Sequence, residues 1–355
     1  MSGKNAEVII AVENGIGVLT LNRPEGLNAL TLDMVHTIKQ QLEHWAGDDS
    51  VAAVAIQGAG EKAFCAGGDI RALYDSYKSG GTLHRVFFED EYALDLAIHN
   101  YSKPVVSLMN GFVMGGGMGV AQAASVRVVS DRARLAMPET GIGFFPDVGA
   151  TYFLGRLPGR LGEYLALTGA QMGAGDAIYA GLADVYLSEA DFQQMPGLLA
   201  ELDLSSVETV KAGLGQRRQG ALEAPVACLL PVIAEVFSKD TVPEIRDALV
   251  ALVENESKSE SVRSWAEKTL SIMSARSPMG MAVALELVHR GRELSLADSF
   301  ALEMHLVLQW FDEGDIVEGI RALIVDKDKS PHWQPATLDE LDPARVKAFF
   351  DGFSV

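Results

Sequence analysis

The chain has 355 residues, 48% of them hydrophobic and 22% charged, which is the composition of a globular protein with a large core and one or two domains. Its 48 acidic and 29 basic residues give a formal net charge of −19, which excludes a general binder of nucleic acid or of anionic membranes. A single anionic small ligand stays compatible with this charge if a local basic patch receives it. The cationic side chains that could form such a patch are Arg23, Lys62, Arg71, Lys327 and Lys329.

The two cysteines, Cys65 and Cys228, cannot form a disulfide framework or a Cys-rich metal site, which favours a reducing compartment. No run of about 18 apolar residues occurs, and the first residues, MSGKNAEV, lack the pattern of a secretory signal. We therefore expect a cytoplasmic protein, with Cys65 in a packing role. The seven histidines show no ligand spacing, so we predict no metal site.

The N-terminal residues predict a β-hairpin followed by a helix. Val8–Val12 and Ile16–Leu21 are β-rich runs, and Asn14-Gly15 between them is a strong two-residue turn signal. Thr31 is then a predicted N-cap, because apolar residues recur after it with a period of about 3.6 residues.

The next segments predict a sheet that is covered on both faces. Val51–Gln57 and Val105–Met109 are short apolar runs without polar alternation, and each leads into a glycine-rich loop. Strands that alternate with helical segments indicate an α/β fold up to about residue 190, in which parallel strands are joined by right-handed crossovers.

Beyond that point the sequence becomes mainly helical. Leu202–Gln219 is the best candidate for a mobile or linking segment, Val262–Ser274 and Met281–Arg290 predict helices, and an apolar run at Ile320–Val325 precedes a proline-punctuated segment. We therefore divide the chain into a core at residues 1–200 and a mainly helical C-terminal region at residues 201–355 that packs on it.

Two glycine-rich loops could expose backbone N–H groups. One loop, Ala63–Ile70, contains Gly67 and Gly68, and the other, Gly111–Gly119, precedes a predicted helix whose N-terminal dipole would strengthen a donor. Two donors, one near Ala66 and one near Gly116, would form an oxyanion hole if they converged on a carbonyl oxygen. The alternative for each loop alone is a tight turn that requires glycine.

Two acids, Glu139 and Asp147, lie in one irregular loop that glycine and proline interrupt. A carboxylate near an apolar pocket has a raised pKa and can serve as a base, an acid or a nucleophile, and Phe144 and Phe145 could provide such surroundings. The alternative is a solvated loop carboxylate. A second acidic cluster, Glu89–Glu91, would in isolation be a solvated helix start.

Other chemistries are disfavoured because the sequence lacks their motifs. It contains no G-x-x-x-x-G-K-[ST], no G-x-G-x-x-G, no G-x-S-x-G and no H-E-x-x-H. The sequence therefore gives little support to four other classes: nucleotide-binding proteins, dinucleotide-binding proteins, serine hydrolases and zinc proteases.

Three segments together resemble the crotonase, or enoyl-CoA hydratase/isomerase, superfamily: Asn22–Leu30, Lys62–Ile70 and Lys103–Gly119. The resemblance implies an α/β fold, a spiral of ββα units here followed by a helical C-terminal region. It also implies acyl-CoA thioester substrates and an oxyanion hole made by the backbone N–H groups of Ala66 and Gly116. Coenzyme A would be part of the substrate, with no separate cofactor, and the protein could be a homo-oligomer.

Within the superfamily the chain is more similar to the 3-hydroxyisobutyryl-CoA hydrolases. Three further segments carry this likeness: Phe87–Tyr92, Met137–Leu154 and Asp315–Pro335. The resemblance assigns catalytic roles to Glu139 and Asp147. The substrate-binding residues that it implies are Glu91, Gly116, Glu139 and Asp147, together with Gly67, Gly68 and Asp69.

The implied reaction is hydrolysis of 3-hydroxyisobutyryl-CoA in valine degradation, with Glu139 as nucleophile or general base and with Glu91 and Asp147 gripping the 3-hydroxyl group. Hydratases of the superfamily carry a second glutamate shortly after the glycine run, where this chain has Gly119. An enoyl-CoA hydratase or isomerase is therefore the second hypothesis. A non-catalytic acyl-CoA-binding protein is the third, and the retained acids disfavour it.

Overall fold

The structure is a computed structural model, and it describes residues 6–217 and 222–354. Its residues group into two compact units that interleave along the sequence. Unit 1 contains residues 1–69, 86–136 and 171–225, and unit 2 contains residues 70–85, 137–170 and 226–355. The division expected at residue 200 remains a prediction.

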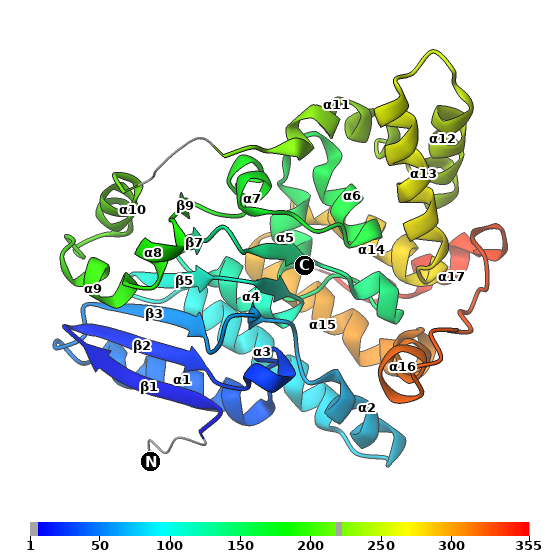
Figure 1. Ribbon diagram of the computed structural model, residues 1–355. Coiled ribbons are helices and arrows are strands. Elements are labelled where there is room, and N and C mark those ends of the chain that lie inside the picture. The colour runs from blue at the N-terminus through cyan, green and yellow to red at the C-terminus, as the bar shows by residue number, and fades with distance from the viewer. Residues whose placement is uncertain (1–5, 218–221, 355) are drawn as a thin grey trace. The chain divides into compact units, whose positions relative to one another are not determined.

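Unit 1 is built on two sheets (Figure 1). The six-stranded sheet has the order β1-β2-β3-β5-β7-β9; β1 and β2 are antiparallel, and every later pairing is parallel. Its strands are β1 (Val8–Glu13), β2 (Ile16–Leu21), β3 (Ala53–Gly58), β5 (Val105–Met109), β7 (Val126–Val129) and β9 (Val185–Tyr186). The second sheet is parallel throughout and consists of β4 (Ala63–Cys65), β6 (Phe112–Met114) and β8 (Arg134–Ala136).

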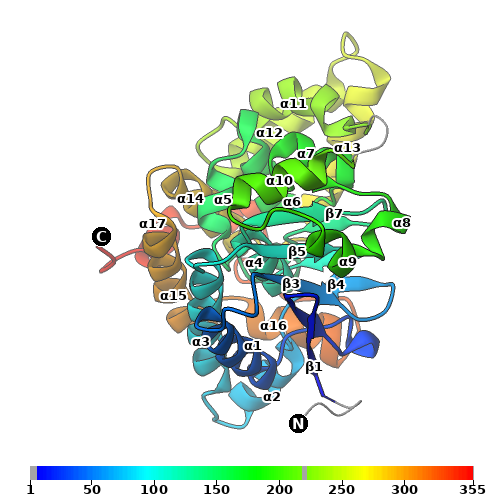
Figure 2. The ribbon, with the colours of Figure 1, turned by 90° about the vertical axis from the view of Figure 1, so that its left-hand side faces the viewer.

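The predicted hairpin and first helix are confirmed. Asn14 and Gly15, at φ 52° and 80°, form the turn between β1 and β2, since a two-residue turn that matches the strand twist needs positive φ at both positions. Helix α1 (Leu32–Ala46) begins where the Thr31 side chain accepts a hydrogen bond from the Met34 N–H. Figure 2 shows α1 against the hairpin.

The segment expected to be mobile or linking is instead partly core. Helix α10 (Val207–Gly215) starts with a capping box between Ser206 and Thr209. Its side chains Val210 and Leu214 are fully buried among residues of the six-stranded sheet, such as Val185. The expectation was therefore wrong for this helix, because the polar positions of the segment form its outer face. Residues 218 and 219 of the expected segment lie outside the described residues.

Other helices complete unit 1. They are α3 (Leu83–His99), whose first residues belong to unit 2, and α4 (Gly116–Ala123), α7 (Ala174–Ala180), α8 (Glu189–Phe192) and α9 (Met195–Ala200), with a 3₁₀ turn, η1 (Pro24–Gly26).

Unit 2 is helical over its described residues. Helices α12 (Val242–Glu254) and α13 (Glu260–Ser274) lie side by side, and α14 (Pro278–Gly291) packs on α5 (Ala150–Gly155) and α6 (Leu161–Thr168) (Figures 1 and 2). The predicted helices at Val262–Ser274 and Met281–Arg290 are therefore confirmed within α13 and α14. The remaining helices are α2 (Ile70–Lys78), α11 (Pro225–Val236), α15 (Leu296–Glu313), α16 (Ile316–Ile320) and α17 (Pro343–Ala348). The short turns are η2 (Glu139–Ile142), η3 (Pro158–Arg160), η4 (Arg321–Val325, a π-helical turn) and η5 (Leu338–Glu340). Among the described residues, no helix is both long and apolar enough to cross a membrane.

Candidate active site

In unit 1, the two glycine-rich loops lie at one edge of the small sheet. Strands β4 and β6 are parallel, so the residues that follow them emerge at the same end. Glycine is required at Gly117, because a Cβ there would collide with the Cys65 carbonyl group. At Gly67, with φ 109°, a Cβ would lie 3.8 Å from the Met114 carbonyl oxygen. The structure thus brings together the two loops predicted to carry the donors.

The N–H of Ala66, a predicted oxyanion donor, is already engaged. It donates to the Leu27 carbonyl oxygen at 3.0 Å, which fixes the start of the loop. Leu30 forms an isolated bridge with Gly68, donating to the Gly67 oxygen and accepting from the Asp69 N–H. The two hydrogen bonds of this bridge use the Gly67 oxygen and the Asp69 N–H, and neither uses the N–H of Gly68. The Gly68 N–H has no hydrogen-bond acceptor within residues 6–217 and 222–354. The Ala66 N–H, expected as a donor to substrate, is thus engaged within the protein, and the role of either amide stays a prediction.

Gly116 is the first residue of helix α4, the helix that the sequence predicts directly after it. The first N–H groups of a helix have no partner within it, and the Gly115 cap has no side chain to accept one. The N–H of Gly116 accordingly has no acceptor in the part of the chain that the structure describes.

Glu91 lies directly against Gly116. It belongs to the middle of α3 and is 2% exposed, so the alternative of a solvated helix start fails for this acid, although the neighbouring Glu89 is exposed. A Cβ on Gly116 would collide with Glu91 Oε1. A substrate held by the Gly116 N–H would therefore meet a carboxyl group within the same unit.

The Cys65 thiol is buried beneath these loops. Burial, with smaller contributions from Glu91 and Asp95, raises its pKa to about 12, against the lowering effect of its contact with Gly67. The thiol therefore stays protonated and packs as an apolar group, which agrees with the role predicted for Cys65.

In unit 2, Glu139 opens the short turn η2 and is 6% exposed. Its Oε2 atom has no hydrogen-bond partner among the described residues. Burial raises the pKa of Glu139 well above its ordinary value, nearby Asp147 raises it further, and Arg276 opposes both. The alternative of a solvated loop carboxylate therefore fails for Glu139. A buried acid of this kind can act as a base or nucleophile once it is ionised.

Backbone and side-chain contacts fix the η2 turn from several elements. The Thr140 hydroxyl donates to the Leu167 oxygen at 3.1 Å, and the Thr140 carbonyl accepts from the Ser277 N–H at 3.0 Å. Trp310 Nε1 donates to the Gly143 carbonyl at 2.8 Å. The position of Glu139 thus depends on helices far away in the sequence.

Asp147, the other predicted acid, is 4% exposed and belongs to unit 2 with Glu139. It precedes a left-handed turn, in which Val148 has φ 53° and Gly149 has φ 82°. A β-branched residue at positive φ is rare and strained. The structure therefore confirms that Glu139 and Asp147 are buried neighbours, while their chemical roles stay predictions.

Sequence reasoning missed two charged residues of this cluster. Glu303, fully buried on α15, has its pKa raised to about 8 by burial and by Asp147. Arg276 donates from Nη2 to the Thr168 oxygen at 2.7 Å, and burial lowers its pKa while Glu139 raises it. A signal for Glu303 was available, because this acid interrupts the apolar stripe that continues with Leu306 and Val307 on α15.

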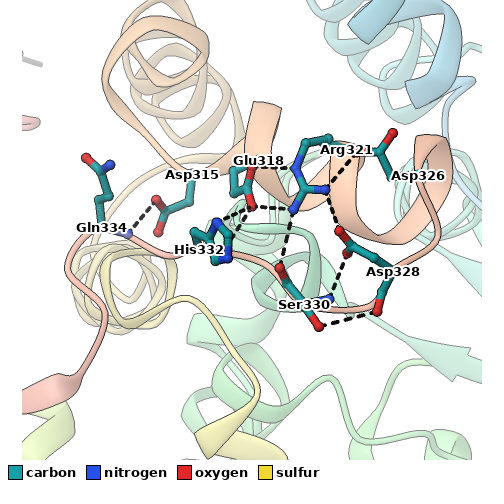
Figure 3. Close-up of polar contacts among 8 residues, drawn as sticks. All are labelled: Asp315, Glu318, Arg321, Asp326, Asp328, Ser330, His332 and Gln334. Atoms are coloured by element: carbon teal, nitrogen blue, oxygen red, sulfur yellow. Dashed lines mark hydrogen bonds and ion pairs between the residues drawn. The ribbon is translucent and has the colours of Figure 1, made fainter.

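Arg321 organises the segment Asp315–Pro335, the last of the three segments that resemble the hydrolases (Figure 3). Its guanidinium contacts Glu318 through two nitrogens, at 2.7 and 2.8 Å, and reaches Asp326 and Asp328 at 2.8 and 2.6 Å. Asp315 accepts from the Gln334 N–H at 3.0 Å and from Ser277, which also contacts the η2 turn. The segment thereby supports the turn that carries Glu139.

The cations considered for a basic patch have different surroundings. Arg23 pairs with Asp69 at 2.9 Å, so this predicted substrate-binding acid forms an ion pair within unit 1. Arg71 pairs with Asp75. Lys327 and Lys329 are exposed, and both have φ 57°. No group of three or more metal-ligating side chains occurs among the residues described.

Comparison with known proteins identifies the class. The family model described as enoyl-CoA hydratase/isomerase matches residues 16–350, so the chain belongs to this family. It is 40% identical to the 3-hydroxyisobutyryl-CoA hydrolase, mitochondrial, of Danio rerio, covering 95% of this chain and 88% of that protein. The human protein of the same name is 37% identical, covering 94% of this chain and 86% of that protein.

Solved structures share the fold. A carnitinyl-CoA dehydratase from Mycobacterium thermoresistibile is 42% identical, with a TM-score of 0.88 over 98% of this chain and 97% of that one. An enoyl-CoA hydratase from Rhodobacter sphaeroides 2.4.1 is 36% identical, with a TM-score of 0.87 over the same shares. The predicted α/β fold of the crotonase type is therefore confirmed.

Proposed function

We propose that the protein is an enzyme that hydrolyses a short 3-hydroxyacyl-CoA thioester, 3-hydroxyisobutyryl-CoA in the first place, to the free acid and CoA. The observation that carries this proposal is the buried Glu139, which has a raised pKa and one oxygen without a hydrogen-bond partner among the described residues. It occurs in a chain that is 40% identical to a 3-hydroxyisobutyryl-CoA hydrolase over 95% of its length.

The glycine-rich loops supply the groups that would polarise the thioester. We assign the two donors to the backbone N–H groups of Gly116 and, in place of Ala66, of Gly68, since the Ala66 N–H is bonded to Leu27. Loss of one oxyanion donor typically lowers the rate by about 10²- to 10³-fold. Each donor would stabilise the negative charge that develops on the carbonyl oxygen.

Glu139 would then act in one of two ways. As a nucleophile, its carboxylate attacks the carbonyl carbon and forms an anhydride, CoA leaves as the thiolate, and water cleaves the anhydride to regenerate Glu139. As a general base, it removes a proton from a water that attacks the same carbon. Labelled oxygen from water enters Glu139 during a single turnover only by the covalent route, and its absence there would support the general base.

Glu91 and Asp147 are proposed to contact the 3-hydroxyl group of the substrate. Both are buried acids: Glu91 lies against Gly116, and Asp147 lies near Glu139. A site that binds a hydroxyl through buried acceptors rejects the analogue without it, because its polar groups would be left unsatisfied.

A hydratase is the second candidate, because two similar solved structures bear the names dehydratase and hydratase. Residue 119, where the resemblance places the second hydratase glutamate, is a buried glycine in α4. Water addition by two glutamates thus lacks one of its acids at this position, which favours hydrolysis.

The deciding experiment measures release of CoA thiol from 3-hydroxyisobutyryl-CoA beside hydration of crotonyl-CoA, for the wild type and Glu139→Ala. We expect thiol release that the variant loses. Hydration without thiol release would establish the hydratase instead, and binding without turnover of either thioester would establish a non-catalytic acyl-CoA-binding protein. A role in valine degradation, a cytoplasmic location and a homo-oligomeric state remain predictions.

A further inference from the structure

A buried acid on α15 holds the turn that carries Asp147. Glu303 accepts the Gly149 N–H on Oε2 at 2.8 Å and the Thr151 N–H on Oε1 at 2.9 Å. The N–H of Ala150, between them, donates to the carbonyl oxygen of Asp147 itself at 2.8 Å. Three successive amides are thus fixed, two of them by one side chain.

This arrangement replaces a local cap. The residue at the N-cap of α5 is Gly149, which has no side chain to accept the first N–H groups of the helix. Glu303 performs that task from a helix about 150 residues further along the chain. It also fixes the direction in which the chain enters α5.

The turn needs such support because it is strained. Val148 is β-branched and has φ 53°, and Gly149 follows at φ 82°. Strained backbone of this kind persists only where the surrounding structure over-determines it, and it gathers at functional sites. The packing of Leu296 and Phe300 against Gly149, each 3.2 Å from a Cβ there, adds to the constraint.

We propose that Glu303 is a positioning residue that sets the place of Asp147, and through it the preference of the enzyme for 3-hydroxyacyl thioesters. The inference rests on the proposed function, in which Asp147 contacts the substrate hydroxyl. Glu303 itself contacts backbone, so its contribution to the reaction passes through Asp147.

The test compares kcat/KM for 3-hydroxyisobutyryl-CoA with kcat/KM for isobutyryl-CoA, which lacks only the hydroxyl group. Glu303→Gln keeps the size of the side chain but has one oxygen acceptor for two N–H donors. We expect the ratio to fall about tenfold or more, since small misplacements of this kind strongly reduce rates. The matched control is Glu163→Gln. Glu163 is also a buried acid of unit 2, but it accepts hydrogen bonds from the side chains of Arg160 and Arg292, not from the backbone of the Asp147 turn. This variant should leave the ratio unchanged.

A double-mutant cycle separates positioning from general loss of stability. In the Asp147→Asn background, Glu303→Gln should cause no further fall in the ratio. This inference would be overturned if Glu303→Gln kept the wild-type ratio while Asp147→Asn lost the preference for the hydroxylated thioester. The proposed function would then stay intact. A wild type without any preference for the hydroxylated thioester would overturn both.

A second variant keeps the test valid if Glu303→Gln does not fold. Val148→Gly removes the strain of the turn, because glycine adopts positive φ freely. Val148→Gly alone should keep the preference, because Glu303 still fixes the turn. Val148→Gly combined with Glu303→Gln should fold and lose the preference, because glycine gives the turn further conformations once Glu303 no longer fixes it. A folded double variant that keeps the preference would contradict the role of Glu303.

Discussion

At the scale of single residues, the surroundings of Glu139 favour its neutral form and so raise its pKa. Burial and Asp147 both disfavour its negative charge, and Arg276 partly restores it. An acid whose pKa lies closer to the working pH combines a useful ionised fraction with greater basicity. Glu139 and its neighbours therefore form one electrostatic unit.

Arg276 should control the pH at which the enzyme becomes active. Its guanidinium lies against Gly141 in the η2 turn, so that a Cβ there would collide with Nη1. Arg276→Gln removes the positive charge that lowers the pKa of Glu139, and the acidic limb of kcat/KM against pH should shift to higher pH. Activity should recover at alkaline pH, whereas a purely structural defect would lower the whole profile equally. Arg263→Gln is the control: it changes an arginine of α13 that does not affect the pKa of Glu139, so it should leave the profile in place.

At the scale of elements, the two glycine-rich loops lie together because the parallel strands β4 and β6 end at the same edge of the small sheet. Gly116→Ala places a methyl group where Glu91 lies, and we expect thiol release to fall about 10²-fold or more. Gly47→Ala is the matched control, since a Cβ there meets no atom within 4 Å and the residue has φ −95°. Comparable activity of both variants would show that the Gly116 loop takes no part in the reaction.

Arg321 should hold the segment at residues 326–334 in its observed conformation. Arg321→Gln removes contacts to Glu318, Asp326 and Asp328, so amide hydrogen exchange in this segment should become faster while exchange in α12 stays unchanged. Lys329→Gln alters an exposed neighbour of the same segment and serves as the control. Equal exchange in wild type and Arg321→Gln would mean that packing, and not these ion pairs, orders the segment.

At the scale of the whole molecule, two acids whose pKa values shift in opposite directions, Glu303 and Asp184, limit the pH range of stability. The pKa of Glu303 is raised to about 8, so its stabilising contribution is complete below its ordinary pKa of 4.5 and is lost as the pH rises through about 8. Asp184 has the opposite sign: although burial raises its pKa, hydrogen bonds from Arg127 lower it overall. Its contribution is complete above 3.8 and is lost as the pH falls below that value.

The Tm of the wild type should therefore fall as the pH rises from 6 to 9. The Tm of Glu303→Gln should fall less steeply over the same range. The Tm of Asp184→Asn should instead become equal to the Tm of the wild type at strongly acidic pH. Thermal unfolding monitored by circular dichroism at several pH values checks both signs. Parallel Tm curves for wild type and Glu303→Gln would contradict the raised pKa.

The sequence alone determined the local elements and the chemistry of the loops. Turn residues such as Asn14-Gly15, the Thr31 cap and the apolar runs act through neighbours in the chain, so they predicted β1, β2, α1 and β5 correctly. The glycine-rich loops and the acids Glu139 and Asp147 were found because their residue types limit the chemistry they can perform.

Only the tertiary structure decided which groups are available and which are held. The Ala66 N–H is occupied by Leu27, Glu91 is buried rather than solvated, and α10 belongs to the core. Glu303 reaches a turn more than 150 residues earlier in the chain. Such contacts depend on long-range packing, burial and backbone pairing. The apolar stripe of α15 signals that Glu303 is buried, but no local pattern in the sequence specifies which groups these residues contact.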